Sequence, residues 1–298
     1  MWFLFAIITI VMWGGADLFY KISSSPDDRF SHLKIVIAVG AVMGLHAVGL
    51  ILFFEPDYSF FLIIKYLPVS LMYILSMAIG YFGLRYIELS VSSPVQNSSG
   101  AVACILCLIF LNQKATALQL AAVAFISVGI VLLSVFEKRK VNSISSSTTL
   151  KTDRKYTVSA VAIIFPILYC VIDGLGTFLD AFYLEGELLS ENEANISYEL
   201  TFLIVGILAL LYLIFIKKEK FTFKKQRSNY IAAALETAGQ FFYIRAMSRN
   251  AVITAPLIAC YSIVSVLLSR IFLKEKLSKG QYITIGVIMA AIAVLGIE

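Results

Sequence analysis

The chain has 298 residues, of which 60% are apolar and 14% are charged, and its mean hydropathy is +0.89. Soluble proteins are about 45–50% apolar and about 25% charged, so a globule of this length could not bury so much apolar surface. The composition excludes a soluble enzyme, a nucleic-acid-binding protein and a disordered scaffold. The net charge of +5 does not indicate nucleic-acid binding, because the basic residues form short clusters between apolar runs rather than one patch.

Ten apolar segments are long enough to cross a bilayer core, which takes about 20 residues of helix. In chain order the predicted spans are residues 2–20, 34–54, 63–85, 93–111, 116–136, 157–180, 196–216, 229–248, 251–273 and 279–297. The first segment lacks the basic start and small-residue cleavage site of a signal peptide, so we expect it to remain as a span. The predicted fold class is an all-α membrane protein with ten transmembrane helices.

The lysines and arginines predict the orientation of these spans, because basic loops stay in the cytoplasm. Twenty of the 24 lie beside the loops that follow spans 1, 3, 5, 7 and 9. The other side carries Lys65, Lys114, Arg245 and Arg249, together with an acidic stretch at residues 185–193. We therefore expect a multi-pass protein of the cytoplasmic membrane with both termini outside.

Residues 138–155 break the apolar pattern, being basic, rich in serine and threonine and without helical periodicity. They predict a flexible cytoplasmic linker between a first half, residues 1–137, and a second half, residues 156–298.

The two halves share short sequences at a constant offset, which indicates an internal duplication. Residues 110–114 (FLNQK) recur 162 positions later as residues 272–276 (FLKEK). The same offset relates Pro94 to Pro256 and Gln119 to Gln281. Since each half has five spans, an odd number, the second copy must be inverted in the membrane. The prediction is two inverted five-helix repeats, an arrangement that places a transporter's site between the repeats.

These features resemble the drug/metabolite transporter superfamily, in particular its ten-helix EamA type. The resemblance rests on the five-plus-five architecture, on Trp13-Gly14 in the first span, on Pro94 and Pro256 as helix starts, and on the repeated turn. It implies a central cavity between the halves that opens alternately to either face without ATP. The chain departs from the family in its predicted external termini and in Gln113, where the family usually has glutamate.

Ionisable side chains inside the spans are candidate functional residues, because each costs at least about 2.5–3.5 kcal/mol in mid-membrane. Asp17 is one, with an i, i+4 ion pair to Lys21 as the alternative explanation. Asp173 has no basic residue within a helical turn, and Asp180 follows on the same face. The two aspartates would suit a cation or proton exchange, whereas hydrogen bonds from another helix would give Asp173 a structural role.

The span at residues 229–248 carries the densest polar stripe. Glu236, Gln240 and Tyr243 follow at spacings of four and three, so they share one helix face. Glu236 is too deep for its short side chain to reach the interface easily. It is the strongest candidate for binding substrate or a coupling ion, with pairing to Lys21 or Arg270 as the alternative.

Three further polar residues complete the predicted site. Gln96 and Asn97 belong to a polar run near the start of the fourth span, and Tyr261 lies near the start of the ninth. They would offer hydrogen bonds and an aromatic wall to a ligand. His46, alone in an apolar span, is interpreted as a packed neutral ring rather than a proton relay.

The function predicted from these residues is secondary transport of a small organic metabolite or drug-like solute, with protons as the candidate coupling ion. The paired carboxylates and tyrosines favour a cationic or zwitterionic solute. A passive channel or a non-transporting scaffold is the alternative. An intramembrane enzyme is disfavoured because the chain has no nucleophile motif and only two histidines. No metal site and no cofactor are expected, and the partners are the solute and membrane lipid.

Overall fold

The computed structural model describes residues 1–24, 28–86, 89–111, 116–147, 164–249, 251–273 and 279–295, and these ranges fold as helices joined by turns and short loops. The first half contains α1 (Trp2–Ser23), α2 (Ser31–Phe53), α3 (Phe61–Gly83), α4 (Leu89–Gln96), α5 (Ser99–Phe110) and α6 (Ala117–Ser147). The second half contains α7 (Ile164–Glu185), α8 (Glu191–Leu211), α9 (Arg227–Met247), α10 (Ala251–Ile258), α11 (Tyr261–Phe272) and α12 (Lys279–Leu295). A π-helical turn, Tyr212–Ile216, continues α8, and a 3₁₀ turn, Phe223–Gln226, precedes α9.

The helices have the length and surface of membrane spans. Five of the described helical segments are long and apolar enough to cross a bilayer: Trp2–Ser23, Ser31–Phe53, Phe61–Gly83, Ile164–Glu185 and Glu191–Ile216. Many large apolar side chains face outward, Leu45 with 76% of its surface exposed. Such a surface requires lipid rather than water around it.

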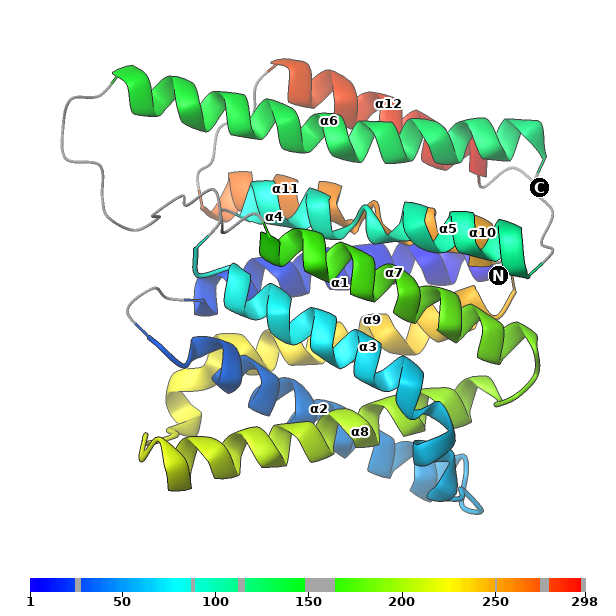
Figure 1. Cartoon of the computed structure of the whole chain (residues 1–298), viewed down its shortest axis with the longest axis vertical. Coiled ribbons are helices and arrows are strands. Elements are labelled where there is room, and N and C mark those ends of the chain that lie inside the picture. Colours follow the sequence, from blue (N-terminus) through cyan, green and yellow to red (C-terminus); the bar gives the residue numbers. More distant parts are fainter. Residues whose placement is uncertain are drawn as a thin grey trace.

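The helices run roughly alongside one another in a layered bundle (Figure 1). The α6–α12 pair forms one edge of the bundle, α2 and α8 form the opposite edge, and the remaining helices lie between them. The contact of α2 with α8 is close because glycines meet there: a Cβ on Gly40 would lie 2.5 Å from the carbonyl oxygen of Phe202 and 3.1 Å from the Cα of Gly206.

Two of the predicted spans are broken rather than continuous. The span predicted at 93–111 is divided into α4 and α5 by a turn at Asn97 and Ser98, and the span at 251–273 is divided at Ala259 and Cys260. The prediction that Pro94 and Pro256 start helices is wrong. Each is the sixth residue of a short helix.

The first part of the predicted linker is helical. Residues 138–147 continue α6 as a regular helix up to Ser147, whereas the sequence indicated no helical periodicity there. Serine and threonine disfavour a helix only weakly, so they do not stop one that is already nucleated. Residues 148–155 lie outside the described part of the chain, as do residues 112–115 and 274–278, which hold most of the repeated turn.

The helix boundaries repeat at the offset found in the sequence. α1, α4 and α5 each begin and end 162 residues before α7, α10 and α11. The packing repeats as well. In the first half α1 packs against α9 and α11 of the second half, and its counterpart α7 packs against α3 and α5, the counterparts of α9 and α11.

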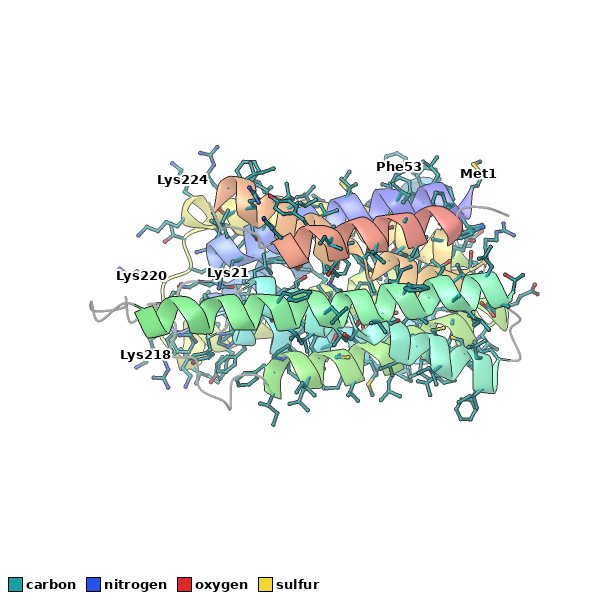
Figure 2. The ribbon with its side chains drawn as sticks, turned by 90° about the horizontal axis from the view of Figure 1, so that it is seen from above. Met1, Lys21, Phe53, Lys218, Lys220 and Lys224 are labelled. Atoms are coloured by element: carbon teal, nitrogen blue, oxygen red, sulfur yellow. The ribbon has the colours of Figure 1, made fainter. Side chains whose placement is uncertain are left out.

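The two ends of the bundle differ in charge. Lys21, Lys218, Lys220 and Lys224 lie at one end, called the basic end below (Figure 2). Met1 and Phe53 lie at the opposite end, called the Met1 end.

Candidate functional site

A central cavity of about 70 Å³ lies between the two halves of the chain, and it brings together all eight residues predicted for the site. They are Asp17, Gln96, Asn97, Asp173, Glu236, Gln240, Tyr243 and Tyr261. Helices of both halves line it, including α1, α3 and α4 from the first and α7, α9 and α10 from the second. The cavity has room for several water molecules in this conformation.

Asp17 is held across the two halves. Its Oδ2 atom accepts hydrogen bonds of 2.8 Å from the hydroxyl of Ser93 on α4 and from the hydroxyl of Ser265 on α11. The amino group of Lys21, proposed above as its ion-pair partner, donates to the carbonyl oxygen of Leu84 at 3.0 Å. Asp17 therefore joins α1 to both broken helices, and it also lines the cavity.

Asp173 on α7 is bound in a similar way. Its carboxylate accepts a hydrogen bond of 2.7 Å from Ser99 and one of 3.2 Å from Ser76. Asp173 is only partly buried and lines the cavity. The hydrogen bonds proposed as its structural explanation are present, but they leave the residue facing the cavity.

Glu236 on α9 lacks such support. Among the described residues, none gives its carboxylate a hydrogen bond or an ion pair, although only 9% of the residue is exposed. Lys21 bonds to Leu84, and the Arg270 guanidinium lies 4.9 Å from the centre of the Tyr282 ring. The carboxylate of Glu236 is thus the group in the cavity most available to a ligand.

The three carboxylates have no basic counterpart in the wall. Among the described residues that line the cavity there is no lysine, arginine or histidine. Seven tyrosines line it instead: Tyr20, Tyr73, Tyr81, Tyr169, Tyr198, Tyr243 and Tyr261. An acidic, aromatic wall of this kind attracts cations.

Trp13 organises one wall of the cavity. Its ring packs 5.0 Å from that of Tyr243 and 5.7 Å from that of Tyr261. Its indole Nε1 donates to the carbonyl oxygen of Glu236 at 3.2 Å. Gly239 makes this possible, because a Cβ there would lie 2.3 Å from the indole ring.

Toward the Met1 end the cavity borders a hydrogen-bonded polar cluster, called the tyrosine seal and formed by Tyr66, Tyr73, Tyr243 and Asp180. Tyr66 donates to the fully buried carboxylate of Asp180, and Tyr73 donates to its second oxygen at 3.4 Å. The hydroxyls of Tyr73 and Tyr243 share a hydrogen bond of 2.6 Å. Tyr73 and Tyr243 also line the cavity, so the seal and the site share residues.

A comparison with known protein families finds a match within the second half of the chain. Residues 196–297 match the family model described as the EamA-like transporter family. These residues belong to the EamA-like transporter family. The resemblance stated above is therefore confirmed over these residues, and with its apolar helices the chain is a multi-pass membrane protein.

The comparison with solved structures extends over nearly the whole chain. One chain, described only as a crystal structure of a protein, matches with a TM-score of 0.65 over 98% of this chain and 94% of its own length. The sequence identity is 14%, so this likeness establishes the fold alone. No protein with curated annotation matches the sequence.

The two helix breaks lie at the site. Asn97 and Ala259, each at a break, both line the cavity. The side chains of the first break are bonded locally: Gln96 donates to Ser92 at 3.0 Å, and Asn97 donates to Ser93 at 3.1 Å. Irregular backbone at membrane depth is tolerated where it is buried in protein or lines a cavity, and broken helices are a feature of transporter binding sites.

One ionisable residue escaped the sequence analysis. Glu199 on α8 has a fully buried side chain, and the Nδ1 atom of His46 lies 2.8 Å from both of its carboxylate oxygens. The predicted span begins at Ile196, which would place Glu199 in its first turn, near the membrane surface. A capping box formed by Ser190 and Glu193 starts the helix earlier, at Glu191, so Glu199 lies two turns inside it. The interpretation of His46 as a packed neutral ring overlooked this partner.

Proposed function

We propose that this chain is a secondary transporter that carries a small organic cation through the central cavity by alternating access. The observation that supports this most is the set of three carboxylates, Asp17, Asp173 and Glu236, around one cavity whose described wall has no basic residue. Carboxylates are costly inside a membrane, and a cationic ligand would compensate that cost. Zwitterionic solutes fit less well, because their own carboxylate would meet no cation in this wall.

The inverted-repeat architecture is part of the proposal. Each half would cross the membrane five times if each broken helix is counted as a single crossing, so the second half would enter the membrane in the opposite sense. The offset of 162 residues in helix boundaries, the exchange of packing partners and the pair of helix breaks all support a duplication. A cavity between inverted repeats can open to either side when one repeat rocks against the other.

The basic end is proposed to face the cytoplasm, because basic loops are retained on that side. The tyrosine seal would then close the cavity toward the outside. A reporter that fluoresces only in the cytoplasm, fused after Glu298, should stay dark. Bright cells would reverse the assignment.

The driving force is proposed to be an ion gradient, with protons as the candidate, because the sequence has no ATP-binding motif. A channel is the alternative. The hydrogen-bonded tyrosine seal at the Met1 end favours a carrier, since a channel needs one continuous path.

Flux into vesicles reconstituted with the purified chain tests the proposal. Vesicles preloaded with unlabelled tetramethylammonium, guanidinium or putrescine should take up the labelled ion by counterflow, whereas succinate and glucose should give none. Glu236→Gln and Asp173→Asn should abolish this uptake with membrane insertion intact. Asp57→Asn, an exposed carboxylate in the α2–α3 loop, is the matched control and should keep it.

Each other outcome contradicts part of the proposal. Downhill flux without counterflow would indicate a channel, and no flux of any cation would indicate a scaffold or a different substrate class. Wild-type rates in both cavity variants would remove Glu236 and Asp173 from the mechanism.

A further inference from the structure

A second ionisable site lies outside the central cavity, where α2 and α8 meet. His46 and Glu199 form it, with side chains that are 33% and 0% exposed. Asn195, one turn before Glu199 on α8, donates to the Glu199 Oε1 atom at 3.1 Å. The exposed edge of the imidazole faces an apolar groove between α2 and α9. This pair belongs to neither the cavity wall nor the tyrosine seal.

Polar side chains on α8 lie between this pair and the Met1 end. Asn192, Asn195 and Glu199 follow at spacings of three and four, so they share one face of α8. The carbonyl oxygen of the Asn192 side chain accepts from the Arg245 guanidinium at 2.7 Å, and the Asn192 amide donates to Glu55 at 2.9 Å. Asn192, Arg245 and Glu55 all line a polar vestibule at that end.

Titratable groups from α9, the start of α8 and the loop before α3 surround the pair. Arg245 on α9 acts electrostatically on Glu199, and its guanidinium lies 3.6 Å from the centre of the Phe241 ring, which itself lies 5.7 Å from the His46 ring. Glu191 at the start of α8 acts on Arg245 in turn. The loop before α3 contributes Tyr58, whose hydroxyl bonds Ser197 at 2.7 Å.

The position of the pair allows it to control the contact between the halves. The close approach of Gly40 to Gly206 lies nearer the basic end, and the pair lies toward the Met1 end of the same two helices. α8 also carries Tyr198 into the cavity, and α9 carries Gln240 and Tyr243. A change at the pair would therefore move helices that form the site.

We propose that His46 and Glu199 form the binding site of a coupling proton, which enters from the vestibule at the Met1 end. A proton from water in the vestibule reaches the imidazole along the polar face of α8, and the resulting ion pair holds α2 to α8. When the proton returns to water, the ion pair is reduced to a hydrogen bond from the neutral ring, which holds the helices less strongly, and the Met1 ends of the two helices can separate. A substrate cation in the cavity does not compete for this site, because the two are separate.

The coupling role rests on the proposed transport function, and two measurements separate the two ideas. In vesicles, Glu199→Gln and His46→Gln should retain tetramethylammonium counterflow and lose uphill accumulation driven by a proton gradient. A purely structural pair would lower both activities together. Asp28→Asn, which removes one half of the 2.6 Å Asp28–Lys34 pair at the basic end, is the control and should change neither.

The second measurement needs no substrate. Across the neutral range, the purified wild-type chain should exchange about one proton more with a pH dye than the double variant of His46→Gln and Glu199→Gln, because coupled groups titrate as a unit. Equal proton exchange would overturn the proposal even if transport is found. Unaltered proton-driven accumulation in both single variants would also overturn it. Absence of counterflow in the wild type would refute only the transport function. The dye titration would then decide whether the pair binds a proton.

Discussion

The hydroxyl groups of Tyr73 and Tyr243 lie 2.6 Å apart and join α3 to α9, two helices that occupy corresponding places in the two halves. Both residues line the central cavity, and Tyr73 also donates to Asp180 in the tyrosine seal. A ligand that moves either ring would therefore disturb the closure toward the Met1 end.

Tyr243→Phe should open this end of the cavity more often. The variant keeps the ring that packs on Trp13 and removes the hydroxyl, which weakens the seal by about 1 kcal/mol. That is about a fivefold shift toward the open conformation. The measurement is the rate at which a membrane-impermeant maleimide labels Ala255→Cys, a cavity residue, in a background without the four native cysteines.

The matched control for this labelling is Tyr58→Phe. It also removes a tyrosine hydroxyl contact at the Met1 end, the 2.7 Å bond to Ser197, but it lies outside the seal. Equal labelling in the Tyr243→Phe variant and in the control would mean that the Tyr73–Tyr243 bond does not close the cavity.

Gly239→Ala should displace Trp13. The new methyl group would lie 2.3 Å from the indole ring, too close for any rearrangement that keeps the bond from Trp13 to the carbonyl of Glu236. Overpacking of this kind costs about 1–3 kcal/mol. Since the chain has only two tryptophans, a shift of the emission spectrum in a Trp2→Phe background reports on Trp13 directly. Gly49→Ala, where a Cβ would meet nothing within 4 Å, should leave that spectrum unchanged.

The candidate site is predictable from the sequence because its signal is local. A carboxylate or amide inside an apolar run costs free energy wherever the run packs, so Asp17, Asp173 and Glu236 are recognisable from their neighbours in the chain. The residues that form hydrogen bonds with them are not recognisable in this way. Ser265, which bonds Asp17, is 248 residues away along the chain, and a serine in a span has no cost large enough to single it out.

The helix breaks and the buried pair illustrate a second limit. Proline is favoured in the first turn of a helix, which makes Pro94 resemble a helix start, but the helix begins five residues earlier and the proline lies within it. Glu199 escapes prediction for a related reason, since an error of five residues in a helix start moves a residue from the interface into the membrane. Boundaries depend on caps and tertiary contacts that hydropathy does not register.

Gly40→Ala should destabilise the whole bundle. Its Cβ would lie 2.5 Å from the backbone carbonyl of Phe202, an atom that cannot rotate away as a side chain would, so α2 and α8 would have to separate. We expect a loss of about 1–3 kcal/mol and a melting temperature lower by several degrees. Thermal unfolding in detergent measures it, with Gly49→Ala on the same helix as the comparison. A melting temperature equal to that of the wild type would show that the α2–α8 contact is looser than its glycines indicate.

Binding of an organic cation should weaken as the pH falls. Protons and the cation compete for the same carboxylates, so each proton bound in the cavity removes part of the negative charge that attracts the ligand. Quenching of Trp13 fluorescence by tetramethylammonium would report the affinity, because Trp13 borders the cavity beside Tyr243 and Tyr261. Glu236→Gln should reduce both the affinity and its dependence on pH, since Glu236 is the carboxylate without a partner among the described residues. Tighter binding in acidic buffer would mean that the ligand is recognised through neutral hydrogen bonds, from groups such as Gln96 and Asn97, rather than through charge.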